Sequence, residues 1–62
     1  MYSNFHSDLI PGVFVINEKQ CKWGIGQIQS SVNNMVTINF EHVGKKVVNV
    51  NAKEINLKII KI

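Results

Sequence analysis

The chain has 62 residues, of which 45% are hydrophobic and 18% charged, and its net charge is +3 at neutral pH. This length allows one domain with a small core and leaves little room for the deep pocket of a typical enzyme. The positive charge comes from lysine, with no arginine, which argues against bidentate reading of bases or phosphates. With a single cysteine, no secretory signal and no long apolar segment, we expect a cytoplasmic protein without membrane contact.

The expected elements are strands and turns, because valine and isoleucine dominate the apolar residues and both favour strands. Residues 1–10 are expected to form a loose lead-in, and Pro11-Gly12 a turn before the first strand. A short 3₁₀ turn is expected at 51–54. The expected strands are 12–16, 23–32, 36–41, 45–50 and 57–62. Short strands with closely spaced turns predict one all-β domain over 11–62, a small five-stranded barrel.

The middle hairpin is expected to define the core. Gly24 and Gly26 indicate a bend or bulge, and Asn33-Asn34 marks the turn. Regular pairing around a two-residue turn would drive glutamines into the core, so we predict an odd-length loop or a bulge. Ile28 and Ser30 then face inward with Val36, Ile38 and Phe40. The predicted pairs are Val32 with Val36, Ser30 with Ile38 and Ile28 with Phe40.

Two motifs in this hairpin resemble a known family. Residues 23–30 read WGIGQIQS and residues 36–45 read VTINFEHVGK. They are similar to the WGxGQVQS and VTVNFEHxGK motifs of small bacterial proteins in domain-of-unknown-function family 3553. Residues 12–15, GVFV, resemble that family's opening GxxV strand. Where the family has His-Pro or Arg-His after the first strand, this chain has Ile16-Asn17-Glu18, so no role for a basic residue is carried over.

That family in turn resembles the Tudor-like domain at the C-terminus of superfamily 1 repair helicases. The resemblance implies an SH3-like (Tudor-like) barrel. By analogy alone it also implies contact with RNA polymerase or a DNA-repair factor.

A polar face edged by tryptophan is the predicted partner-binding surface. Its residues are Trp23, Gln27, Gln29, Asn39, Glu41 and His42. The amides face away from the inward residues Ile28 and Phe40, and tryptophan is enriched at interface hot spots. The alternative interpretation of Trp23 is packing over the barrel end. The leading hypothesis is a small non-enzymatic adaptor that binds a protein linked to transcription or DNA repair.

The alternative function is weak, non-sequence-specific nucleic-acid binding. Lys22, Lys45 and Lys46 would contact phosphates while Trp23 stacks on a base. The same lysines are also interpreted as a device for solubility and for protecting the edge of the sheet.

Catalysis, metal binding and cofactors are not expected. Glu41-His42 has no accompanying nucleophile and is interpreted as turn chemistry, with Glu41 pairing with Lys45 or Lys46. Cys21, His6 and His42 are too few for a structural zinc site. The apolar C-terminal run is expected to cover a barrel end in a monomer, which leaves a weak dimer contact as the alternative. This run consists of Leu57, Ile59, Ile60 and Ile62.

Overall fold

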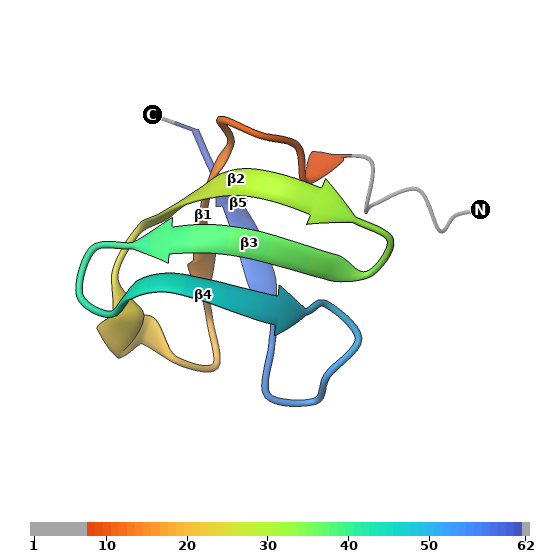
Figure 1. Ribbon diagram of the computed structural model, residues 1–62. Coiled ribbons are helices and arrows are strands. Elements are labelled where there is room, and N and C mark those ends of the chain that lie inside the picture. The colour runs from red at the N-terminus through yellow and green to blue at the C-terminus, as the bar shows by residue number, and fades with distance from the viewer. Residues whose placement is uncertain (1–7, 62) are drawn as a thin grey trace.

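The computed structural model describes residues 8–61, and these form one five-stranded antiparallel sheet with the order β4-β3-β2-β1-β5. The strands are β1 (Phe14–Asn17), β2 (Gly26–Val32), β3 (Met35–Phe40), β4 (Gly44–Asn49) and β5 (Leu57–Ile60). In Figure 1, β2, β3 and β4 form a front layer, and β1 and β5 cross behind it. The prediction of an all-β chain with five strands is confirmed.

A turn of 3₁₀ helix, η2 (Cys21–Trp23), precedes β2. The prediction of a 3₁₀ turn at 51–54 was wrong, because the i→i+3 bonds there are not consecutive. Ala52 N–H donates to the Asn49 carbonyl at 3.0 Å and Ile55 N–H to the Ala52 carbonyl at 3.1 Å, forming two separate turns. The expected second strand also began too early, since Trp23 is the last residue of η2 and β2 begins at Gly26.

The β2–β3 hairpin combines a two-residue turn with a bulge. Val32 lies opposite Met35, which leaves Asn33-Asn34 as the turn, and Asn33 has a φ of 56°. Ile28 lies opposite Ile38, whereas Ser30 lies opposite Thr37, so Gln29 is the extra residue of the bulge. A bulge was one of the two predicted solutions, and it is confirmed.

The three predicted residue pairs were wrong, because the bulge lies inside β2 instead of at the turn. The extra residue is Gln29, inside β2, so β2 and β3 pair in a different register from the one that a three-residue loop would give. Ser30 consequently lies opposite Thr37 and is exposed, and it does not line the interior.

The core lies between the two layers. Its buried members are Leu9, Val15, Ile28, Val36, Ile38, Phe40 and Val48. The predicted inward positions in β3 and Ile28 in β2 are confirmed, since alternation along a strand sets the side that each residue faces. Leu9 falls inside the range expected to be a loose lead-in but is buried with the core. Residues 1–7 of that lead-in, and Ile62, lie outside the described residues.

Asn17 connects the end of β1 to the chain that enters β5. Its side chain is 0% exposed, and its Oδ1 accepts the N–H groups of Lys19 at 3.2 Å and Asn56 at 2.9 Å. Its Nδ2 donates to the Glu54 carbonyl at 3.5 Å. A buried amide is stable only when its polar atoms are bonded, so these contacts fix both segments.

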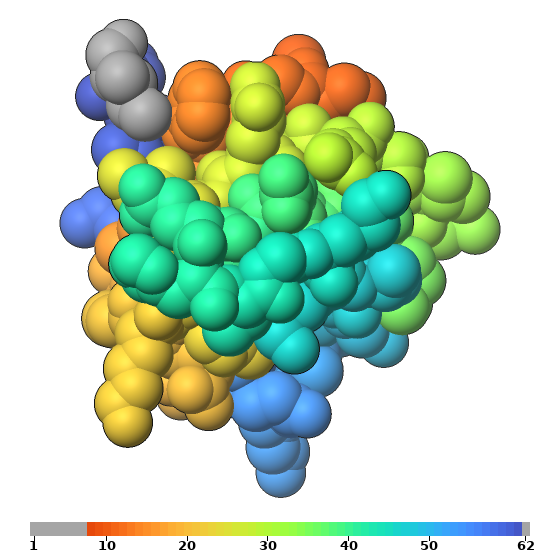
Figure 2. All heavy atoms as spheres, turned by 60° about the vertical axis from the view of Figure 1, so that its left-hand side comes forward, coloured from red at the N-terminus to blue at the C-terminus, as the bar shows by residue number. Residues whose placement is uncertain are grey.

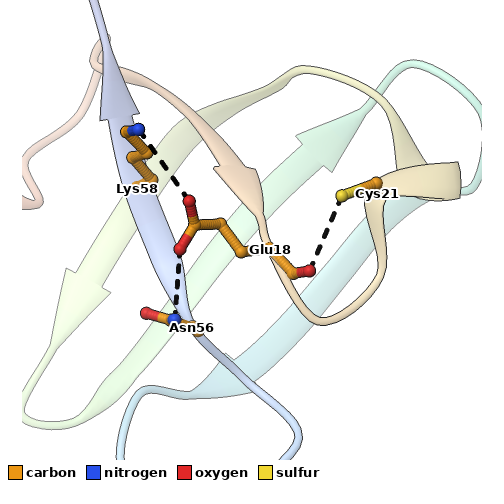
Figure 3. Close-up of polar contacts among 4 residues, drawn as sticks. All are labelled: Glu18, Cys21, Asn56 and Lys58. Atoms are coloured by element: carbon orange, nitrogen blue, oxygen red, sulfur yellow. Dashed lines mark hydrogen bonds and ion pairs between the residues drawn. The ribbon is translucent and has the colours of Figure 1, made fainter.

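Glu18 reinforces the same junction at the surface (Figure 3). Asn56 Nδ2 donates to Glu18 Oε1 at 3.2 Å, and Lys58 Nζ lies 3.9 Å from Glu18 Oε2. The exposed thiol of Cys21 contacts the Glu18 carbonyl at 3.6 Å. These exposed contacts contribute little individually, and the buried amide of Asn17 dominates the junction.

Candidate functional site

Most of the predicted polar face surrounds one surface hollow of about 590 Å³, called here the outer hollow. Its lining residues are Phe14, Ile25, Gln27, Asn39, Phe40, Glu41, His42 and Gly44. The structure therefore brings together four of the six residues predicted for the partner-binding surface. These four are Gln27, Asn39, Glu41 and His42.

The register of the sheet places the amides of the outer hollow side by side. Gln27 lies directly opposite Asn39, and Phe14 lies opposite Gln27 on its other side. Facing residues project from the same side of a sheet, so these side chains form a row across β1, β2 and β3. Lys45 continues the row on β4, opposite Asn39. Gln27 Nε2 also donates to the Gly12 carbonyl at 3.3 Å, which holds the amide against the sheet.

Glu41 holds the backbone at one end of the outer hollow. Its Oε1 accepts the Ile25 N–H at 2.9 Å, and its own N–H donates to the Ile25 carbonyl at 2.9 Å. Within residues 8–61 the ion pair that forms is Glu18–Lys58, so the interpretation that Glu41 pairs with Lys45 or Lys46 was wrong. The carboxylate instead satisfies a backbone donor just before β2.

The two glycines of the WGIG segment are required by close approach. A Cβ on Gly24 would lie 2.7 Å from His42 Cδ2 and 2.8 Å from Glu41 Oε1, and its φ is 80°. A Cβ on Gly26 would lie 2.5 Å from Ile38 Cγ2. The first glycine lets the β3–β4 turn pack against the start of β2, and the second makes room for the core.

Trp23 lies away from the outer hollow. Its ring packs edge-on against Phe40, with centroids 5.1 Å apart and planes at 62°, and Lys46 Nζ lies 5.0 Å from the ring centroid. Lys46 lies opposite Ile38, a core residue, and therefore faces inward. Trp23 is half-buried on this inner side, so it does not edge the polar face. Gln29 is exposed at the bulge, farther along β2.

A second hollow of about 520 Å³ lies along β4 and is called here the edge hollow. Its lining residues are Trp23, Met35, Lys45, Lys46, Val47, Val48, Asn49, Ala52, Glu54 and Ile55. It collects Trp23 and two of the three lysines predicted to bind nucleic acid. The third, Lys22, is exposed on η2 and does not line it. Figure 2 shows the β3–β4 turn and the start of β4, in teal, in front, beside the yellow segment that contains η2.

The C-terminal apolar run contributes to a third, smaller hollow of about 340 Å³. Leu57 and Ile59 line it together with Leu9, Val50 and Ile55. Leu57 is half-buried against the core, whereas Ile59 is 37% exposed. The expectation that this run covers a barrel end in a monomer stays a prediction.

Four lining residues of the outer hollow were not predicted as part of the partner-binding surface: Phe14, Ile25, Phe40 and Gly44. Phe40 was predicted to face the core. Val15 faces the core with 0% exposure, and alternation then places Phe14 on the opposite side of β1. An aromatic residue at an outward position was therefore the available signal. Ile25 gave no such signal, because it precedes β2 and follows η2, where the two-residue period does not apply.

Within residues 8–61 there is no cluster of three metal-ligating side chains, and no helix is long and apolar enough to cross a membrane. His6, which was weighed with Cys21 and His42 as a metal ligand, lies outside the described range. Cys21 is exposed.

A protein-family model described as Protein of unknown function (DUF3553) matches residues 9–60. The chain belongs to this family. The match includes both motifs of the middle hairpin and begins at Leu9, the first buried residue of the core. Searches of curated proteins and of solved structures found no match. The family thus covers the outer hollow and the edge hollow alike.

Proposed function

We propose that this DUF3553 member is a non-enzymatic protein-binding module of the SH3-like (Tudor-like) type, and that the outer hollow receives a segment of its partner. A sheet in which β1 lies between β2 and β5, and in which the two layers cross, supports a small barrel. The analogy with Tudor-like helicase domains makes RNA polymerase or a DNA-repair factor the first partner to test.

The observation that carries this proposal is the combination of an apolar floor and an amide rim in the outer hollow. Phe14 and Ile25 are half-buried and supply apolar surface, whereas Gln27 and Asn39 are exposed beside them. Protein-binding surfaces combine a desolvated apolar centre with a polar rim. Neutral amides can bond a peptide backbone without the cost of desolvating a charge. The hollow therefore suits a short peptide segment better than a charged ligand.

Quantitative affinity capture from the native host tests the proposal. The double variant Gln27→Ala/Asn39→Ala removes both rim amides and leaves the core unchanged. Gln20→Ala/Lys53→Ala is the matched control, because both side chains are exposed outside the hollow. We expect a defined set of proteins with wild type and control and its loss with the rim variant. Equal recovery by all three proteins, or recovery by none, contradicts the assignment.

Nucleic-acid binding is kept as a second candidate because of the edge hollow. Trp23 lies there with Lys45 and Lys46, and small β-domains bind single strands with an aromatic platform and basic side chains. Nucleic-acid binding is measured by adding a single-stranded oligonucleotide to the protein while following the fluorescence of Trp23. Neutralisation of three phosphates gives a slope of about −2 for log K against log salt. An unchanged spectrum at low salt eliminates this candidate.

A further inference from the structure

β4 is an end strand of the sheet and has a neighbour, β3, on one side (Figure 1). Val50 N–H donates to the Asn34 carbonyl at 2.9 Å. Because bonding positions alternate along an antiparallel ladder, the residues of β4 that bond to β3 are Gly44, Lys46 and Val48. The N–H groups of Lys45, Val47 and Asn49 therefore point to the opposite, free edge.

This edge carries unused backbone bonding groups. Among residues 8–61 no strand pairs with it, and the one turn bond there uses the Asn49 carbonyl, which accepts from Ala52 N–H. The Val47 side chain is 61% exposed. An end strand with free N–H and C=O groups is a template for pairing with another extended chain.

The surroundings of the edge define the chemistry of the chain that fits it. Lys45 and Lys46 have no carboxylate within 4.0 Å among the described residues, where the ion pair formed is Glu18–Lys58. The edge hollow beside β4 offers Trp23 and Ile55 on the inner side. An incoming strand therefore meets positive charge near the start of β4, exposed valine at its middle and apolar surface beneath.

We propose that β4 accepts an extended segment of a partner protein as an added strand, with an apolar side chain opposite Val47 and an acidic one opposite Lys45. Such strand addition obtains affinity from backbone bonds and specificity from alternate side chains. This surface is independent of the outer hollow, and the failure of either proposal leaves the other standing.

The register specifies a pattern that can be synthesised. Positions opposite Val47 and Lys45 lie two residues apart and on the same face. An antiparallel segment therefore reads apolar, any residue, acidic, and a parallel segment reads the reverse. The middle residue lies opposite Lys46, which faces inward with Trp23.

A second copy of this chain fits the edge less well. Antiparallel pairing of two β4 strands about Val47 would place Lys45 opposite Asn49 and Lys46 opposite Val48 of the other copy. The lysines of both copies would then line the joined edge with no acidic residue opposite them. Opposite charges on facing residues stabilise paired strands, so an acidic partner gains a contact with Lys45 that a second copy of this chain does not supply.

Amide hydrogen exchange measured by NMR tests strand addition residue by residue. The probes are three eight-residue peptides of threonine and valine with blocked ends, and each contains one glutamate. The glutamate lies two positions after the central valine in the first peptide, two positions before it in the second and next to it in the third. In the free protein the amides of Lys45 and Val47 should exchange rapidly and those of Lys46 and Val48 slowly. Either two-position peptide should slow exchange at Lys45 and Val47, and the adjacent-glutamate peptide should bind more weakly.

A charge reversal provides the second arm. Lys45→Glu should weaken binding of the two-position glutamate peptides about three- to tenfold. It should strengthen binding of the same peptides with lysine in place of glutamate. Lys19→Glu, the matched control on an exposed turn, should change neither affinity. Slow exchange at Val47 in the free protein, or no protection by any peptide, overturns the proposal. Protection that grows with protein concentration alone also overturns it, in favour of self-association. Shifts confined to Phe14 and Asn39 would support the outer hollow instead.

Discussion

Gly24 is the residue on which the contact between β2 and the β3–β4 turn depends. Its backbone, with φ of 80° and ψ of −166°, lies in a region that is almost restricted to glycine. A side chain there would also collide with His42 and Glu41. The carboxylate of Glu41 that bonds Ile25 N–H therefore keeps its place because residue 24 has no Cβ.

Gly24→Ala and Gly44→Ala separate these two effects. Gly44 has a φ of 73°, and a Cβ added there would meet no atom within 4 Å, so its substitution carries backbone strain alone. We expect Gly44→Ala to cost about 1–2 kcal/mol. Gly24→Ala should cost at least about 1 kcal/mol more, since its contacts must also move. Urea unfolding of both variants measures this, and equal losses would show that the collision is relieved without cost.

At the scale of elements, the bulge in β2 reconciles a two-residue turn with an apolar inner face. Ile28 and Ile38 pair before the bulge, and Ser30 and Thr37 pair after it. Gln29 is therefore an inserted residue whose removal leaves both flanking sets of pairs in register. Any other single deletion in the regular part of the hairpin reverses the faces beyond it.

Deletion of Gln29 is thus expected to give a folded protein, whereas deletion of Thr37 is not. The first change joins two pairs that are already in register, and the second turns Val36 away from the core or Ile38 out of it. Near-ultraviolet circular dichroism around the Trp23 band, with a cooperative thermal transition, distinguishes the outcomes. A deletion of Gln29 that abolishes the transition would mean that the bend at the bulge, and not the pairing, is what the fold requires.

The position and inner face of β3 were predictable from sequence, because Val36, Ile38 and Phe40 alternate with polar residues. The start of β2 and the side taken by Ser30 were not. The choice between a bulge and a longer loop was not predictable, because either one supplies the extra residue that keeps the apolar side chains of both strands on the inner face. The side taken by Trp23 was also not predictable. It lies in η2, where a strand's alternation does not apply, and its contacts with Phe40 and Lys46 are distant in sequence.

At the scale of the whole molecule, one small core supports both candidate surfaces. Asn39 of the outer hollow lies on the same strand as the buried Ile38, and Lys46 and Val47 of the edge hollow lie on the same strand as the buried Val48. A domain of this length has a free energy of unfolding of only about 3–9 kcal/mol. A single substitution that leaves a large cavity in the core can therefore unfold the domain and abolish both surfaces.

Ile38→Ala tests this dependence, because Ile38 is 0% exposed at the centre of the core. The expected loss is about 2–5 kcal/mol, and Ile38→Val, the conservative control, should lose about 0.5–1.5 kcal/mol. Thermal denaturation followed by circular dichroism measures both. A melting temperature for the alanine variant close to that of wild type would place the centre of the core elsewhere.

The connection between Asn17 and Asn56 spans 39 residues, and β1 pairs with β5 along its whole length. During synthesis β1 emerges early, but its second neighbour is supplied only when residues 57–60 leave the ribosome. Until then the Asn17 amide lacks the Asn56 N–H, and β1 lacks its pairing with β5. Because non-local contacts must close before they stabilise the chain, folding should be completed after translation of β5 and not progressively during it.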